Sequence, residues 1–204
     1  MRVLLVEDHP MVRDGLKRLL AALPDAVVAE AASGQEAIAE VRAERPELVI
    51  LDLNLPDVGG LELMRRLARE GSSAPVLILS MHAEPVYAVR ALEAGAGGYV
   101  SKSAPRAELL EAIRTVAAGG RYVEARIAQA IVLKTSDDNA FDKLSARELE
   151  ILRLIAEGQS VGDIAKRLGV AHRTAANACT QLKAKLGLER MSDLVRTAVE
   201  LTAV

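Results

Sequence analysis

The sequence is poor in cysteine and aromatic residues, and it has no long apolar run. Cys179 is the only cysteine, so the chain cannot form an internal disulfide framework, which is typical of proteins in reducing compartments. Tryptophan is absent and aromatics make up 2% of the residues, so Leu, Val, Ile and Ala must build the cores. The apolar run at 3–6 is too short for a signal peptide, and no stretch approaches a membrane span. We therefore expect a cytoplasmic protein with no membrane partner.

The charge differs between the two parts of the chain. Residues 1–120 contain 13 Lys and Arg against 17 Asp and Glu, a net charge of -4, whereas residues 141–204 contain 10 against 8, a net charge of +2. The stretch 164–188 has no acidic residue. A chain of 204 residues, half of them hydrophobic, is long enough for two domains. The charge asymmetry indicates a different partner for each domain.

Five short apolar runs alternate with segments of helical spacing in the first 120 residues. Continuous runs of this length are typical of strands that are buried on both faces of a parallel sheet. The pattern predicts a doubly wound α/β domain with a five-stranded parallel sheet, whose functional residues lie at the carboxyl ends of the strands. The runs occupy residues 3–6, 26–29, 48–51, 76–79 and 98–100.

The rest of the chain predicts a linker and an all-α domain of four helices. We assign residues 121–140 to the linker, with a helix over 125–133 and a polar stretch over 134–139. In the domain at 141–204, Ser145 and Glu148 form the signature of a capping box, and Ser160 and Ser192 are expected to cap later helices.

The short turn at 168–170 separates the second and third of these helices. A turn of this length, with Gly169 at its centre, is typical of a helix-turn-helix motif.

Three carboxylates follow strands that are neighbours in the doubly wound order. Glu7 and Asp8 follow the first strand, and Asp52 follows the third. Carboxylates held close together repel each other, and a divalent cation with oxygen ligands removes the conflict. Mg²⁺ is the natural candidate because it is held by a few carboxylates and waters.

A hydroxyl and an ammonium group are predicted at the same edge of the sheet. Ser80 ends the fourth strand and Lys102 follows the fifth. Lys102 can pair with one phosphoryl oxygen while Ser80 donates a hydrogen bond to another. Asp52 can then act as a nucleophile that forms an aspartyl phosphate.

The set Glu7-Asp8, Asp52 with Pro56, Ser80 and Lys102 resembles the receiver domain of two-component response regulators over residues 1–120. The resemblance implies that Asp52 accepts phosphate from a sensor histidine kinase. It also implies that Mg²⁺ binds Asp8, Asp52 and the backbone carbonyl of Asn54, with Glu7 acting through water.

The same resemblance places Tyr99 at the aromatic switch position, although an aromatic packed at the edge of the surface is the alternative. His9 and His82 are expected to be loop residues beside the site rather than metal ligands. We expect no enzyme activity beyond catalysis of the protein's own phosphorylation and dephosphorylation at Asp52.

A set of positions over 144–188 matches one family pattern: Arg147, Glu148, Leu152, Gly158, Ser160, Ile164, Ala165, Leu168, Val170, Thr174, Lys185, Leu186 and Gly187. With these residues, about the last 60 positions resemble the LuxR-type DNA-binding domain, and the two domains together resemble the NarL/FixJ subclass. The resemblance implies a phosphorylation-controlled transcription regulator that inserts the helix at 171–186 into the major groove of double-stranded DNA. Phosphorylation is expected to draw Ser80 and Tyr99 inward and reshape the surface around the fourth and fifth strands, which should favour a symmetric homodimer. The expected DNA contacts are Arg173, Thr174, Asn177, Gln181, Lys183 and Lys185.

The sequence departs from this family pattern in the third helix. Ala175, Ala176 and Ala178 stand where the family usually has Val, often a basic residue, and His, and Gly162 stands where Lys is frequent. An adaptor that docks a protein through the three alanines is therefore the alternative function. A phosphoaspartate hydrolase would need an acid two residues after the nucleophile, but that residue is Asn54.

Overall fold

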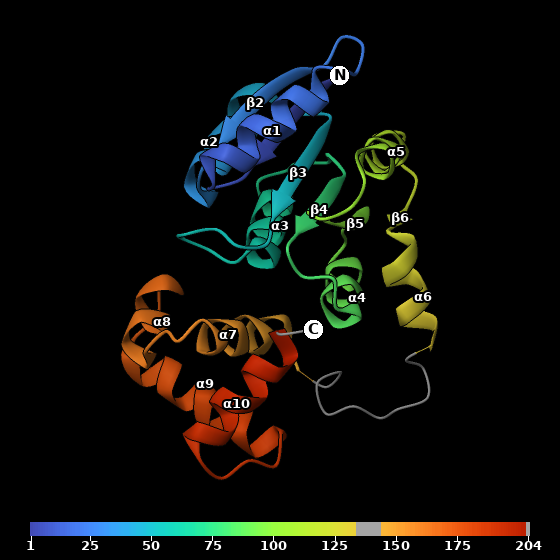
Figure 1. Cartoon of the computed structure of the whole chain (residues 1–204). Helices are drawn as coiled ribbons and strands as arrows, with labels where there is room; N and C mark the ends of the chain where they lie inside the picture. The colour runs from blue at the N-terminus through green and yellow to red at the C-terminus, as the bar shows by residue number, and fades with distance from the viewer. Residues whose placement is uncertain (134–143, 203–204) are drawn as a thin grey trace. The chain divides into compact units, whose positions relative to one another are not determined.

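The protein consists of two compact units, Met1–Val132 and Leu133–Val204, in a computed structural model that describes residues 1–133 and 144–202 (Figure 1). The polar stretch predicted over 134–139 lies outside the described residues. Within those residues, no helix is both long and apolar enough to span a bilayer.

The described part of the first unit contains a six-stranded parallel sheet in the order β2-β1-β3-β4-β5-β6. Its first five strands lie where the apolar runs predicted them, so the doubly wound α/β fold is confirmed. The order places β1 and β3 side by side, with β4 and β5 following. The strands are β1 (Arg2–Val6), β2 (Val27–Ala31), β3 (Leu48–Asp52), β4 (Val76–Ser80), β5 (Gly98–Ser101) and β6 (Tyr122–Val123).

Five helices of the first unit cover the two faces of the sheet. Alternate strand residues point to opposite faces, and Val3 and Leu5 share one core cluster with residues of α1 and α5. Buried residues of α2, α3 and α4 lie outside that cluster and pack on the other face. The helices are α1 (Pro10–Leu20), α2 (Gly34–Glu44), α3 (Gly60–Arg69), α4 (Pro85–Glu93) and α5 (Arg106–Ala117).

The prediction that every strand is buried on both faces is wrong for β2. This strand pairs only with β1, and Val27 is 65% exposed. An edge strand has a neighbour on one side only, so an apolar run does not guarantee burial there. Met11 is also exposed, although its spacing fits the apolar side of α1.

The sheet extends beyond the five predicted strands into the segment that we assigned to the linker. The amide of Tyr122 donates to the carbonyl of Gly97 at 3.1 Å, which adds β6 to the sheet. The helix predicted over 125–133 is confirmed as α6 (Ala125–Leu133), and the compact first unit includes most of it.

The second unit contains the four predicted helices. The capping box at Ser145 and Glu148 is confirmed, and the Ser160 hydroxyl caps the next helix by accepting from the Asp163 amide at 3.2 Å. Gly169 adopts φ +62° in the turn of the helix-turn-helix, a conformation that favours glycine. The predicted cap at Ser192 is wrong, because this residue lies inside the last helix. The helices are α7 (Ala146–Ala156), α8 (Val161–Arg167), α9 (His172–Lys185) and α10 (Met191–Thr202).

An ion pair joins the end of α9 to the start of α7. The Lys185 ammonium lies 2.8 and 2.9 Å from the two carboxylate oxygens of Glu148. Burial alone would raise the pKa of Glu148, but hydrogen bonds from Lys185 and Ser145 outweigh it and hold the pKa below its ordinary value. The capping box and the helix packing therefore depend on one carboxylate.

We expect Gly60→Ala to destabilise the first unit by about 1–3 kcal/mol, because overpacking against backbone is poorly relieved. A Cβ at Gly60 would lie 2.6 Å from the Asp52 carbonyl oxygen and 2.7 Å from the Leu53 Cα. A Cβ at Gly15, inside α1, meets nothing within 4 Å, so the control Gly15→Ala should stabilise by about 0.5–1 kcal/mol.

Urea unfolding followed by tyrosine fluorescence tests this pair of variants. All three tyrosines lie in the first unit and tryptophan is absent, so the signal reports that unit alone. Equal unfolding midpoints for the two variants would contradict the account of Gly60.

We expect Glu148→Gln to lower the stability of the second unit by about 0.5–1 kcal/mol at neutral pH, since it removes the ion pair with Lys185 and the charge of the capping carboxylate, while the Gln oxygen can still accept from the Ser145 amide. The folded pKa of Glu148 lies below its ordinary value of 4.5, so its stabilisation is present above that pH and is lost as the pH falls through the folded pKa.

Circular dichroism of the wild type, Glu148→Gln and Lys185→Met across about pH 3 to 7 measures this dependence. The difference between wild type and each variant should shrink toward acid. A difference that stays constant over the whole range would refute the role given to Glu148.

Candidate functional site

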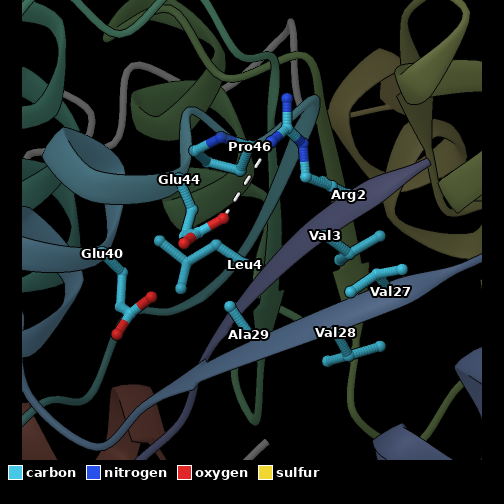
Figure 2. Close-up of a pocket in the computed structure, with 9 residues that line it drawn as sticks. All are labelled: Arg2, Val3, Leu4, Val27, Val28, Ala29, Glu40, Glu44 and Pro46. Carbon is cyan, nitrogen blue, oxygen red and sulfur yellow. Dashed lines mark ion pairs between the residues drawn. The ribbon is translucent and has the colours of Figure 1, made fainter.

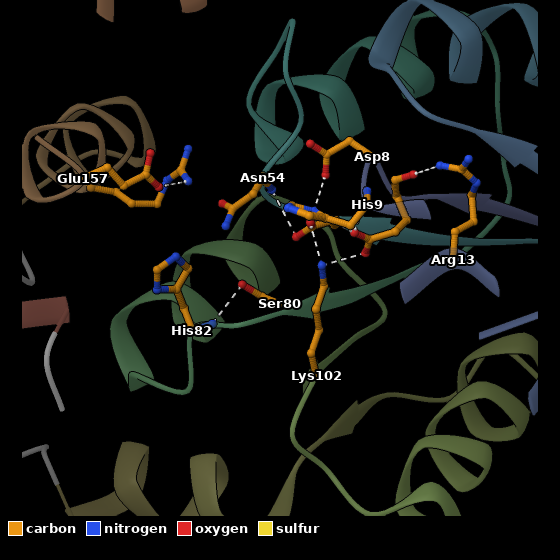
Figure 3. A network of polar contacts seen from close by, with 11 residues as sticks. Asp8, His9, Arg13, Asn54, Ser80, His82, Lys102 and Glu157 are labelled. Carbon is orange, nitrogen blue, oxygen red and sulfur yellow. Dashed lines mark hydrogen bonds and ion pairs between the residues drawn. The ribbon is translucent and has the colours of Figure 1, made fainter. Parts of the chain in front are cut away.

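Three acidic side chains meet at the carboxyl edge of the sheet, as predicted (Figure 3). Glu7 and Asp8 follow β1, and Asp52 ends the neighbouring strand β3. Glu7 and Asp52 are each 1% exposed. Ligand atoms of these three residues and of His9 all lie within 4.8 Å of one another, so carboxylates from two strands share one small volume.

Lys102 neutralises part of this charge. Its ammonium lies 2.6 Å from Glu7 Oε2 and 2.8 Å from Asp52 Oδ2, and its side chain is only 8% exposed. Burial would lower the pKa of Lys102, but the carboxylates of Asp52 and Glu7 outweigh it and raise the pKa. Lys102 therefore stays charged between the two acids.

The Asp52 carboxylate is held by two donors. The Asn54 amide donates to Oδ1 at 3.1 Å, and Lys102 donates to Oδ2 at 2.8 Å. Burial raises the pKa of the Asp52 carboxyl, while the Lys102 ammonium opposes this shift. A desolvated carboxylate at a strand end, beside a fixed ammonium, has the features of an activated nucleophile.

Two oxygens beside this carboxylate fit a hard cation. Asn54 Oδ1 is buried and lacks a hydrogen-bond partner among the described residues, and Asp8 Oδ1 is buried with His9 Nδ1 beside it. Oxygens in such a desolvated acidic cluster suit a divalent ion that prefers oxygen ligands. The donor set therefore fits Mg²⁺. His9 Nδ1, 2.8 Å from Asp8 Oδ1, is a softer donor that faces the same acids.

Arg13, which the sequence analysis missed, supports the acidic pair from α1. Its guanidinium donates to the Glu7 carbonyl at 2.7 Å and to Glu30 at 3.0 Å. This contact, drawn in Figure 3, fixes the turn that carries the acids. Its spacing, six residues after Glu7 on a helix, gave no distinct signal because basic residues are frequent on helix surfaces.

The predicted switch residues are both buried. Ser80, at the end of β4, is fully buried and its hydroxyl accepts from the His82 amide at 3.2 Å. Tyr99 is also fully buried, and its hydroxyl donates to the His82 carbonyl at 2.7 Å. Burial raises the pKa of Tyr99 well above its ordinary value. The alternative of an aromatic at the surface is wrong, since β5 is flanked by strands on both sides.

One face of α9 presents polar side chains at helical spacing. Arg173, Thr174, Asn177 and Gln181 are all exposed. The proposed face of three exposed alanines is wrong: Ala175 is 1% exposed and belongs to the core. Ala176 and Ala178 are only partly exposed. The alanines thus flank a polar face rather than replace it.

The two lysines near the end of α9 have partners within the second unit. Lys183 donates to the Glu189 carbonyl at 3.2 Å, and Lys185 pairs with Glu148. Contact of either lysine with a phosphate would compete with these interactions.

A separate pocket lies between β1, β2 and α2, toward the amino ends of the strands (Figure 2). Arg2 and Glu44 form an ion pair at 4.0 Å on its rim. The pocket contains none of the residues of the carboxyl edge. Its lining is Arg2, Val3, Leu4, Val27, Val28, Ala29, Glu40, Glu44 and Pro46.

Comparison with protein families identifies both units. Residues 3–114 match the response regulator receiver domain, and residues 142–198 match the LuxR family of bacterial regulatory proteins. The transcriptional activator ExaE of Pseudomonas putida is 40% identical over 206 residues, covering 98% of this chain and 96% of ExaE. The methanol utilization control regulatory protein MoxX of Paracoccus denitrificans is 38% identical, covering 96% of this chain and 89% of MoxX.

A solved structure of RcsB from Salmonella enterica, bound to a promoter in the presence of a phosphomimetic, aligns with a TM-score of 0.79 at 26% identity and covers 98% of both chains. The two family matches and the full-length relatives agree with the acidic edge of the sheet and the helix-turn-helix. The chain belongs to the two-component response regulators that join a receiver domain to a LuxR-type DNA-binding domain.

Proposed function

We propose that a sensor histidine kinase phosphorylates Asp52 and that this phosphorylation controls DNA binding by the second unit. The observation that carries the proposal is the position of the Lys102 ammonium, which lies 2.8 Å from Asp52 Oδ2. Ser80, the last residue of β4, lies at the same edge of the sheet. A nucleophilic carboxylate, a fixed cation and a hydroxyl are the groups that phosphoryl transfer requires.

In this mechanism an oxygen of the Asp52 carboxylate attacks the phosphorus of a phosphohistidine on the kinase. The new O–P bond forms as the P–N bond breaks, and the electron pair returns to the imidazole. Lys102 then exchanges its contact with Asp52 for a phosphoryl oxygen, and the Ser80 hydroxyl donates to another. The same groups would catalyse hydrolysis of the aspartyl phosphate by water.

Asp8, Asp52 and the Asn54 carbonyl are the residues we assign to Mg²⁺, with Glu7 acting through water. Receiver domains generally bind Mg²⁺ at an acidic pocket, and the cluster of Glu7, Asp8 and Asp52 supports its presence here. The ion supplies neutralisation of the charge on the transferring phosphoryl group. Lys102 balances one of the three carboxylate charges of Glu7, Asp8 and Asp52. The two charges that remain match those of a divalent cation.

The second unit would bind DNA through α9 in the major groove. Arg173, Thr174, Asn177 and Gln181 would contact bases and phosphates, and Lys183 and Lys185 would lie nearer the DNA backbone. Two features support DNA over a protein partner: the polar face of α9 is exposed, and the alanines that motivated the adaptor hypothesis are partly or fully buried.

The solved relatives support a dimer as the DNA-binding form. One RcsB structure is described as two dimers bound to two parallel DNAs, and another holds promoter DNA in the presence of BeF₃⁻. We extend this to the present chain: phosphorylation would favour a symmetric dimer that matches two half-sites.

We expect one phosphoryl group per chain after incubation with acetyl phosphate and Mg²⁺, because Asp52 is the acid that the receiver family match makes the acceptor and its carboxylate lies 2.8 Å from Lys102. Asp52→Asn should abolish the modification, and intact-mass spectrometry gives the count. Asp57→Asn is a matched control, since Asp57 lies in the same loop but binds the amides of Gly34 and Gln35 at 2.8 and 3.0 Å. A phosphoryl group retained by Asp52→Asn would exclude the assignment.

We expect the salt dependence of DNA binding to report the cations of α9. Ala176→Lys should steepen the slope of log affinity against log salt by about one unit and tighten binding to all sequences alike, while Arg173→Ala should flatten it by about one unit. Arg196→Ala, which removes an exposed charge from α10, is the control and should change the slope less.

Fluorescence anisotropy with labelled duplexes at several salt concentrations measures these slopes. No binding at low salt by the wild type, without rescue by Ala176→Lys, would contradict the DNA-binding function and favour a protein partner.

A further inference from the structure

Glu124 is a buried carboxylate to which the proposed phosphorylation mechanism gives no role. It is 4% exposed, although it lies between β6 and α6 in a segment that the sequence analysis assigned to a linker. Burying a carboxylate is unfavourable unless a donor replaces water. Its Oε2 accepts from the backbone amide of Ser101 at 2.8 Å, and Ser101 directly precedes Lys102.

The position of Glu124 explains why a side chain is needed there. The Glu124 amide donates to the Tyr99 carbonyl at 3.1 Å. This is the last backbone hydrogen bond of the short β5–β6 ladder. The chain then turns into α6, and the Glu124 carbonyl accepts from Ala128 at 2.9 Å instead of continuing the ladder. The next donor on β5 is the Ser101 amide, and the Glu124 carboxylate takes the place of the missing strand carbonyl.

The other side of the same segment is bound to β4. The Lys102 amide donates to the Ser80 carbonyl at 2.7 Å, directly beyond the paired residues Ser80 and Ser101. The backbone that carries Tyr99 and Lys102 is therefore held by Glu124 on one side and by the end of β4 on the other. Figure 1 shows β4, β5 and β6 in this order, with α6 following β6.

We propose that Glu124 is a positioning residue for Lys102: its carboxylate fixes the end of β5 so that the Lys102 ammonium reaches the phosphoryl group on Asp52. This inference rests on the proposed phosphorylation of Asp52. A hydrogen bond from an amide to a carboxylate is about twice as strong as one between neutral groups, so the charge of Glu124 contributes to the fixation.

The contact also couples two parts of the first unit. Glu124 is the residue before α6, so its hydrogen bond to the Ser101 amide links the start of α6 to the end of β5.

The test measures the affinity of the full-length chain for beryllofluoride at saturating Mg²⁺, and its affinity for Mg²⁺ alone, by titration calorimetry. Removal of a charge-assisted hydrogen bond predicts a loss of about tenfold in beryllofluoride affinity for Glu124→Ala, and about threefold for Glu124→Gln, which keeps a neutral acceptor. The Mg²⁺ affinity should not fall in either variant, because the assigned ligands lie on β1, β3 and their loops.

Glu108→Gln is the matched control. Glu108 accepts from the Ala125 amide at 3.2 Å and from the Tyr122 hydroxyl at 3.4 Å, so it holds the start of α6 without touching Ser101. This variant should keep the wild-type affinity for beryllofluoride. Tyrosine fluorescence shows whether each variant is folded. If Glu124→Ala does not fold, the beryllofluoride affinity of Glu124→Gln alone tests the role of Glu124.

The outcomes separate this inference from the function on which it rests. A wild type that binds no beryllofluoride contradicts the proposed phosphorylation itself. A wild type that binds while the Glu124 variants bind equally well contradicts the role of Glu124. Parallel losses of beryllofluoride and Mg²⁺ affinity, or an equal loss in Glu108→Gln, would show general loosening and would also overturn it.

Discussion

The ion pairs of Lys102 with Glu7 and Asp52 are the interaction on which the proposed chemistry of the first unit depends. All three side chains are almost closed to water, and they come from the ends of β1, β3 and β5. Two buried carboxylates this close would otherwise repel each other, and one would be protonated. A buried ion pair is weak support for stability, because desolvation offsets its attraction. In the proposed mechanism, the pair holds a cation beside Asp52, where the incoming phosphoryl group would bind.

Much of this arrangement follows from the sequence because parallel strands bring their carboxyl ends to one edge. The apolar runs located five strands, and the polar residue after each run therefore had a predictable place. Asp52, Lys102 and the acids after β1 meet as expected. The helix boundaries of the second unit were predictable for a different reason. The capping box at Ser145 and the glycine in the turn depend only on residues close by in the sequence.

What the sequence could not supply depends on contacts between distant segments. β6 has two residues, too few for a periodic pattern, and its place in the sheet comes from β5. Glu124 looked like a linker residue because its partner is a backbone amide 23 positions away. Ala175 was taken for part of an exposed docking face, since a small residue on a helix does not reveal which side faces the core. In each case the sequence gives the residue type, but the packing around the residue depends on segments far away in the chain.

A structure of the first unit's site with Mg²⁺ and beryllofluoride, determined on the full-length chain, tests the central claim most directly. The account predicts beryllium bonded to an Asp52 oxygen, the Lys102 ammonium within hydrogen-bond distance of a fluoride, and the Ser80 hydroxyl on another fluoride. Lys102 still bound to Glu7 and Asp52 as it is here, or beryllofluoride bound to a residue other than Asp52, would contradict it.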